Sequence, residues 1–284
     1  MTDAALVSIV ITCYNHARYL GQAIESALAQ TYPQIEVIVV DDGSTDDTCE
    51  VACRYPVRLI SHPNQGLSAA SNAGIHASRG VFVMRLDADD MLDPAYVEET
   101  VRALEADHRS QFAYTEVLYF GAASGTYPVE EFDADTLAER NYIHASAMMR
   151  RNAFEAVGGY APNPQRVRCE DWDLWLSFAD QGMSGVLVRK PLLHYRQHVS
   201  GNMARFNLFW PADVKRELTM AARLQDRHPR LFAPRHLLRR LARLPIRIMT
   251  GRAPVRFGIL LVSFYGVMLS RIVLKTLPRK RCAF

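Results

Sequence analysis

Four short runs of apolar, largely β-branched residues in the N-terminal part of the chain do most to limit its fold. They span Leu6–Thr12, Ile35–Val40, Val57–Ile60 and Val81–Leu86. Runs of this length and composition are typical of buried β-strands. The segments between them carry apolar residues at helical spacing. Strands that alternate with helices predict an α/β fold with a mainly parallel central sheet and helices on both of its faces.

Polar residues directly follow three of these runs. They are Thr12, Tyr14 and Asn15 after the first run, Asp41 and Asp42 after the second, and Asp87 and Asp89 after the fourth. Because parallel strands end at the same edge of a sheet, we expect these side chains to line one crevice. Asn15 is also expected to cap the helix that follows it. The chain has neither a GxGxxG nor a GxxxxGK[ST] pattern, so it supports neither a Rossmann dinucleotide site nor a P-loop.

The stretch VFVMRLDADDMLDP concentrates negative charge at one strand end. Asp87, Asp89 and Asp90 fall within four positions and repel one another unless a cation or a donor-rich ligand lies among them. Oxygen ligands of this kind favour a hard divalent ion such as Mg2+ or Mn2+. A polar loop that caps the helix after Pro94 is the structural alternative. An EF-hand is excluded, because apolar residues follow where a further ligand and a glycine are needed.

Four segments of the chain carry a resemblance to a known family. They read SIVITCYNHARYL, VIVVDDGSTDDT, NQGLSAASNAGI and RGVFVMRLDADDMLDP. In this order and spacing they resemble the nucleotide-sugar-binding half of a family 2 glycosyltransferase with the GT-A fold, over roughly residues 6–204. The resemblance implies an inverting, Mn2+- or Mg2+-dependent transfer of a sugar from a nucleotide-sugar donor, most commonly a UDP-sugar. It also implies a glycan or lipid-linked acceptor in cell-surface polysaccharide synthesis.

The resemblance assigns residues to the nucleotide position by position. Thr12 and Tyr14 resemble residues that line the nucleobase pocket. Asp42 resembles the carboxylate that binds the uracil edge, and Asp41 lies beside it. Ser71 is a departure, because many relatives carry arginine there. A cationic contact to the diphosphate is therefore missing or comes from elsewhere.

The metal and diphosphate contacts are implied in the same way. Asp87 and Asp89 match the DXD motif, in which the first carboxylate tends toward the ribose or the metal and the last toward the metal. His198 matches a histidine that in several relatives completes the metal shell or contacts the diphosphate. Without the resemblance, a histidine in a polar loop is usually only solvated. Arg196 has two interpretations, a phosphate contact or a surface salt bridge.

The segment CEDWDLWLSFADQG predicts a helix in the acceptor half, with Leu174, Trp175 and Phe178 on its buried face. Glu170 and Asp171 lie at its start, where the helix dipole favours negative charge. That position alone has a purely structural explanation. The resemblance places the catalytic base at this acidic pair, with Asp171 as the better match. A base is required, because the attacking sugar hydroxyl must lose its proton.

Charge divides the chain into two parts. Residues 205–284 hold 18 Lys and Arg against 3 Asp and Glu, a net +15, whereas residues 1–204 hold 15 against 27, a net −12. We therefore expect a GT-A domain over residues 1–204 and a basic, amphipathic helical extension over residues 205–284.

The extension predicts attachment to an anionic membrane surface. Phe257–Ser270 has 14 residues without a charge, which is short of the ~20 that a spanning helix needs and suits an interfacial helix. Flanking arginines attract anionic headgroups, so we expect a cytoplasmic protein that is peripheral on the inner face of the cell membrane. Packing on the catalytic domain and binding to a partner protein are the alternatives. Nucleic acid is not expected, because no recognised nucleic-acid motif is present.

The remaining observations bear on compartment and on competing functions. The five cysteines form no CxxC pair and the N-terminus lacks a basic leader, which favours a reducing compartment without secretion. The alternative function is a non-catalytic nucleotide-binding protein that recruits partners to membranes. The presence of Asp87, Asp89 and Asp171 argues against it. A nucleotidyltransferase or sugar-nucleotide phosphohydrolase is a third possibility, which the acidic pair in a separate acceptor half disfavours.

Overall fold

The computed structural model describes residues 4–163, 169–198 and 211–232. It divides into two compact units, Met1–Arg205 and Phe206–Phe284. In the second unit the described part is helix α8 (Pro211–Arg227) and the residues up to 232. The apolar segment Phe257–Ser270 lies outside the described residues. Among the described helices, none combines the length and the apolar character needed to cross a membrane.

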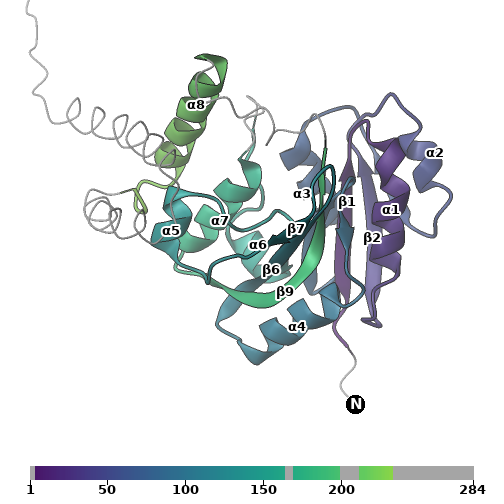
Figure 1. Cartoon of the computed structure of the whole chain (residues 1–284), viewed down its shortest axis with the longest axis horizontal. Helices are drawn as coiled ribbons and strands as arrows, with labels where there is room; N and C mark the ends of the chain where they lie inside the picture. The colour runs from purple at the N-terminus through teal and green to yellow at the C-terminus, as the bar shows by residue number, and fades with distance from the viewer. Residues whose placement is uncertain (1–3, 164–168, 199–210, 233–284) are drawn as a thin grey trace, which may run out of the picture. The chain divides into compact units, whose positions relative to one another are not determined.

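The first unit is a sheet with helices around it (Figure 1). Its strands are β1 (Val7–Cys13), β2 (Ile35–Asp41), β3 (Arg58–Ser61), β4 (Phe82–Asp87), β5 (Met91–Leu92), β6 (Ser110–Gly121), β7 (Gly125–Tyr127), β8 (Met148–Arg150) and β9 (Ser184–Gln197). Its helices are α1 (Ala17–Leu28), α2 (Thr48–Ala52), α3 (Leu67–Ala77), α4 (Tyr96–Ala106), α5 (Ala134–Glu139), α6 (Arg151–Ala156) and α7 (Glu170–Asp180). The strand order is β3-β2-β1-β4-β8-β6-β9-β5, and β7 pairs with β6.

The N-terminal half of the sheet is parallel, as predicted, with β3, β2, β1 and β4 side by side. Helix α1 buries Leu20 and Ile24 in the same apolar cluster as Ile9 of β1. Helix α3 packs on the opposite face, because a Cβ at Gly74 would lie 2.2 Å from the side chain of Val10. Ile9 and Val10 are neighbours in the strand and point to opposite faces. The prediction of helices on both faces is confirmed.

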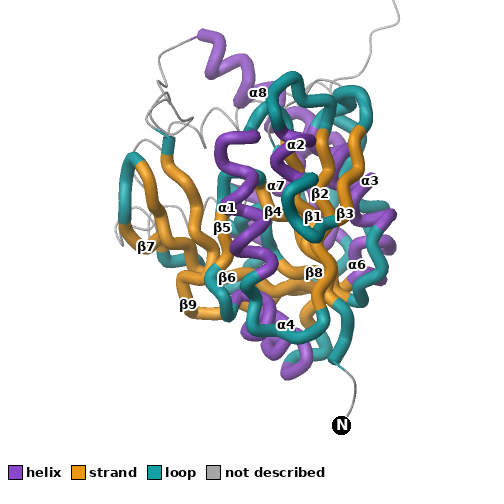
Figure 2. The backbone as a smooth tube through the Cα atoms, turned by 90° about the vertical axis from the view of Figure 1, so that its right-hand side faces the viewer, coloured by secondary structure: helices purple, strands orange, loops and turns teal. Residues whose placement is uncertain are grey.

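The C-terminal half of the sheet is mixed. Strand β8 is antiparallel to both β4 and β6, and β9 runs parallel to β6 with shifts in register. Figure 2 shows β6, β7 and β9 side by side, away from the parallel half. The short strand β5, which follows the acidic stretch directly, pairs with β9. This pairing draws the end of β9 toward the end of β4.

The predicted cap at Asn15 is wrong. Helix α1 begins after His16, and the N–H of Ala17 donates to Asp46 at 2.9 Å. Asn15 instead has φ 55° and accepts a hydrogen bond from the N–H of Thr45 at 2.8 Å. Its side chain therefore connects the turn after β1 to the turn after β2, which fixes two of the loops at the polar edge of the sheet.

Candidate active site

The polar residues that follow β1, β2 and β4 lie along one edge of the sheet. Cys13 is paired in register with Asp41, and Thr12 with Asp87. The hydroxyl of Thr12 is buried and, within the described part of the chain, has no hydrogen-bond partner. Tyr14, two residues further on, is 49% exposed. A buried hydroxyl without a partner beside an open aromatic side chain is the kind of surface that a polar, planar ligand satisfies.

Asp41 and Asp42 are both buried, but their partners differ. The carboxylate of Asp41 accepts hydrogen bonds from Ser44, Cys49 and Ser61. Burial alone would raise its pKa, and these bonds outweigh it and hold the pKa below the ordinary value. Asp41 therefore stabilises the turn after β2 through hydrogen bonds within the protein.

The carboxylate of Asp42 faces the start of helix α3. It accepts the backbone N–H groups of Gln65 at 2.8 Å and Gly66 at 2.9 Å, and the Nδ1 atom of His62 lies 3.5 Å away. Gly66 has φ 94°, a conformation that favours glycine and turns its N–H toward the carboxylate. Asp42 thus fixes the loop between β3 and α3 against the polar edge.

The acidic stretch meets the end of β9. The Nε2 atom of His198 lies 2.9 Å from Oδ2 of Asp89, and Nδ1 of His16 lies 3.8 Å from the same oxygen. Arg196 donates through Nε to the carbonyl oxygen of Asp89 at 2.8 Å. Its backbone N–H donates to Asp90 at 2.9 Å. Asp89 and His198, predicted from sequence as ligands, are therefore neighbours, and Arg196 contacts the same acidic stretch.

His16 was not singled out from the sequence, although it lies in the segment SIVITCYNHARYL just after the first strand. Burial, reinforced by the charges of Asp87 and Asp89, raises the pKa of Asp90 well above its ordinary value.

The donor set at Asp89 fits a divalent cation. A carboxylate oxygen and an imidazole nitrogen are both ligands that Mn2+ accepts. Within residues 4–163, 169–198 and 211–232, no three His, Cys, Asp or Glu side chains form a group that could hold a metal ion by themselves. A cation here would thus need further ligands, and phosphate oxygens are of the required kind.

Asp171 lies in the first turn of α7. Its Oδ2 atom accepts a hydrogen bond from the side-chain amide of Asn141 at 3.0 Å, and its Oδ1 accepts the N–H of Trp172 at 2.8 Å. Burial, and next the charge of Glu170, raise the pKa of Asp171 from 3.8 to about 7. A carboxylate with this pKa is matched to proton transfer near neutral pH. Asn141 was not singled out from the sequence, because nothing local marks a single amide thirty positions away as its partner.

Arg85, inside β4, was also missed. Its side chain is 1% exposed and forms ion pairs with Asp87 and Glu170, each at 3.2 Å. The signal was present in the sequence, because an arginine in the otherwise apolar run VFVMRL must find a partner when it is buried. Burial raises the pKa of Asp87, and Asp89 and Glu170 add to the increase, which the charge of Arg85 opposes.

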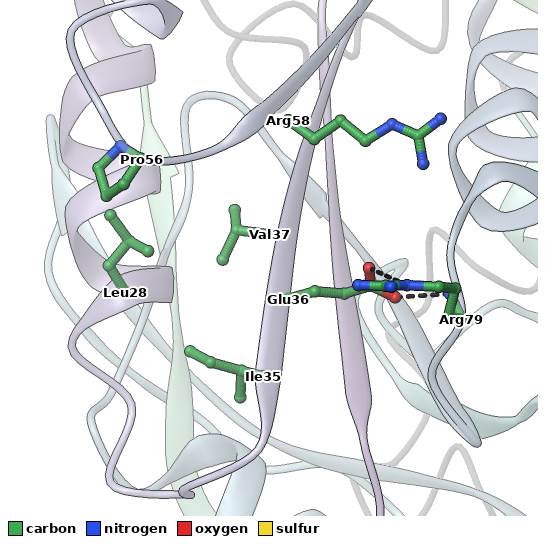
Figure 3. A pocket seen from close by; sticks show the side chains of 7 residues that line it. All are labelled: Leu28, Ile35, Glu36, Val37, Pro56, Arg58 and Arg79. Carbon is green, nitrogen blue, oxygen red and sulfur yellow. Dashed lines mark hydrogen bonds and ion pairs between the residues drawn. The ribbon is translucent and has the colours of Figure 1, made fainter.

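A hollow of about 550 Å³ lies at the other end of the sheet (Figure 3). Its lining includes Ile35, Glu36 and Val37, the first residues of β2. Arg79 faces Glu36 there, with their charged groups 3.5 Å apart. The carboxylates described above follow the carboxyl ends of the strands, so this hollow is separate from them.

Comparisons with known proteins identify the family of the chain. The family model described as glycosyl transferase family 2 matches residues 8–166. The chain belongs to this family. The putative glycosyltransferase EpsE of Bacillus subtilis (strain 168) is 31% identical over 208 residues, which are 69% of this chain and 75% of EpsE. The chondroitin synthase of Pasteurella multocida (strain Pm70) is 34% identical over 187 residues, 62% of this chain but only 19% of the synthase.

Solved structures show the same fold. S. aureus TarS in complex with UDP-GlcNAc superposes with a TM-score of 0.62 at 17% identity, over 76% of this chain and 66% of that chain. The mannosyltransferase PcManGT from Pyrobaculum calidifontis, in complex with GDP-Man and Mn2+, superposes with a TM-score of 0.57 at 18% identity, over 94% of this chain and 81% of that chain. The family and fold predicted from the sequence are therefore confirmed, and the family 2 glycosyltransferase has a GT-A fold.

Proposed function

We propose that this glycosyltransferase moves a sugar, with inversion at the anomeric carbon, from a nucleotide-sugar donor to a glycan or lipid-linked acceptor in cell-surface polysaccharide synthesis. The observation that carries the proposal is the contact between Asp89 and His198, at 2.9 Å. It joins the acidic end of β4 to the end of β9, residues 109 positions apart. The names of the chondroitin and hyaluronan synthase relatives support a polysaccharide product.

The proposed donor contacts come from the residues at the ends of β1, β2 and β4. Thr12 and Tyr14 would contact the nucleobase and Asp42 its polar edge, while Asp41 holds the turn that carries Asp42. Asp87 would face the ribose or the diphosphate. A UDP-sugar is the proposed donor. UDP-GlcNAc in TarS and GDP-Man in PcManGT support a nucleotide sugar of this general kind.

Asp89 and His198 would hold a divalent cation, Mn2+ or Mg2+. Bound there, the cation would supply Lewis-acid stabilisation of the charge that develops on the leaving diphosphate. The Mn2+ in the PcManGT complex supports a cation in a GT-A site.

Asp171 is the proposed base. Its carboxylate takes the proton of the acceptor hydroxyl while that oxygen bonds to the anomeric carbon, and the bond from this carbon to the nucleoside diphosphate breaks. A single displacement with one base inverts the anomeric centre. The raised pKa of Asp171, about 7, supports the role, because a base must both accept the proton and be ionised beforehand.

Calorimetric titration tests the donor site. UDP, GDP and dTDP are each titrated into the full chain with and without Mn2+. We expect Mn2+-dependent binding of UDP that is lost in Asp89→Asn and weakened at least ~10-fold in His198→Ala, as for the loss of one metal contact. His108→Ala, at an exposed histidine after α4, is the matched control and should bind as wild type. Folded protein that binds none of the nucleotides would refute the donor site.

The basic part, residues 205–284, is proposed to attach the enzyme to an anionic membrane surface on the cytoplasmic side. Its net charge of +15 supports this, because each cation near such a surface contributes about 1 kcal/mol. Flotation of the full chain with vesicles of phosphatidylcholine, with and without phosphatidylglycerol, tests it. We expect binding only to the anionic vesicles and release at high salt. Equal binding to both, or to neither, would contradict the proposal.

A further inference from the structure

Arg85 connects the two halves of the first unit inside the protein. Its guanidinium lies 3.2 Å from Asp87 at the end of its own strand and 3.2 Å from Glu170 at the start of α7. It also lies over the ring of Tyr160, 5.4 Å from the ring centre. The strand and the helix are 85 positions apart in the sequence. One side chain therefore ties the donor end of β4 to the helix that carries Asp171.

Burial makes this arrangement sensitive to charge. A guanidinium at 1% exposure is tolerated only when anionic groups compensate for its lost hydration. Asp87 and Glu170 supply the two negative charges. Desolvation would lower the pKa of Arg85, yet Asp87 and the other neighbouring acidic groups raise it. Arg85 thus stays fully charged inside the protein.

The same charges act on the carboxyl group of Asp171. Glu170, on its own helix, and Asp87, on β4, both repel its ionised form, while Arg85 attracts it. Tyr160, from the loop before α7, is buried in the same group, and burial raises its pKa so that it stays neutral. Arg85 is the one positive charge that these contacts place near Asp171 within the described residues.

We propose that Arg85 is a positioning residue that holds the acidic start of α7 against the end of β4 and supplies the positive charge that keeps Asp171 able to act as a base. The inference rests on the proposed function, because it assigns Arg85 to the same site. It adds that the donor carboxylate and the base share one buried counter-ion. A change at either carboxylate is then felt at the other.

Carboxyl titration by NMR tests this without any substrate. The full chain is labelled with carbon-13 at the aspartate side-chain carboxyls, and the Asp171 signal is identified by its loss in Asp171→Asn. In wild type its midpoint should lie at about 7. In Arg85→Met the midpoint should rise by roughly one unit or more, which lowers the ionised fraction of Asp171 at pH 7 from about one half to about one tenth or less. In Glu170→Gln it should fall.

Two further variants separate charge from packing. Arg85→Met with Glu170→Gln removes one charge of each sign and should return the midpoint toward that of wild type. Arg85→Lys keeps the charge and should leave the midpoint within a fraction of a unit. The midpoint in the double variant should lie above that in Glu170→Gln alone. This comparison isolates the charge of Arg85, so it provides a test even where Arg85→Met alone does not fold.

An Asp171 midpoint that stays the same in Arg85→Met and in Glu170→Gln would overturn the inference. Arg85 would then have a purely structural role. Failure of the proposed function has a different signature, namely folded protein that binds no nucleotide with Mn2+. Because the titration needs no ligand, the two failures are distinguishable.

Discussion

Replacing Asp171 with asparagine should make the folded protein more stable and less active. Burial and the charge of Glu170 raise the pKa of Asp171 from 3.8 to about 7. Between these two pH values the folded protein holds a proton that the unfolded chain has released. Asparagine has the same size, carries no charge, and its carbonyl oxygen can still accept the hydrogen bond from Asn141.

The size of the effect follows from the difference in pKa. A shift of roughly three units at about 1.36 kcal/mol per unit corresponds to ~4 kcal/mol. Because the folded pKa is the raised one, the wild type loses this stability as pH increases through the window and has lost all of it above pH ~7. Asp171→Asn should therefore gain about 2–4 kcal/mol over wild type at pH 8, roughly 1–2 kcal/mol at pH 5, and nothing below pH ~4.

Urea unfolding at pH 5 and pH 8, followed by tryptophan fluorescence, measures the gain. Trp172 and Trp175 lie in α7 with Asp171 and report on its unfolding. Asp107→Asn is the control, because the hydrogen bond from Ser110 lowers the pKa of Asp107, and its removal should give no stabilisation. A gain of equal size at both pH values, or no gain, would refute the reasoning. Sugar transfer by Asp171→Asn should fall by about 10²–10⁴-fold, the usual contribution of a general base.

Three other results are expected. Transfer by the wild type should increase with pH through about 7 as Asp171 loses its proton, and a flat pH–rate profile across that range would contradict its role as the base. Thr12→Val removes a buried hydroxyl that has no partner in the described part of the chain. The melting temperature should stay the same or rise, while calorimetry should show UDP binding weakened several-fold, and an unchanged Kd would argue against Thr12 as a nucleobase contact. Gly74→Ala places a methyl group 2.2 Å from Val10 and 2.8 Å from Val40. It should lower the free energy of unfolding by about 1–3 kcal/mol, measured in urea, and a neutral effect would mean that α3 moves away from the sheet at little cost.

The parallel half of the sheet was predictable because its signals are local. Each buried strand there is a continuous apolar run, and each helix carries its own apolar face, so β1, β2 and α1 could be placed from short windows. The strands β5 and β7 have two and three residues. They leave no periodic pattern, and only pairing with β9 and β6 makes them strands. The predicted cap at Asn15 was wrong for the same reason, because the N–H of Thr45, in the loop after β2, donates to the Asn15 side chain.

The site residues likewise differ in whether their sequence signals are local. The carboxylates of Asp87 and Asp89 were identifiable because a strand end and a short motif mark them. Their partners leave no local signal. His198, 109 positions from Asp89, was identified only through the family resemblance, and Arg85, whose second partner Glu170 is 85 positions away, was missed. What the sequence does contain is the requirement for such partners. A buried arginine and a row of adjacent carboxylates cannot remain uncompensated, so a charge that breaks an apolar strand is evidence for a distant counter-charge before that partner is known. For Arg85 this counter-charge is Glu170, which is next to the proposed base Asp171. The ion pair that burial of Arg85 requires therefore lies where it can influence proton transfer by Asp171.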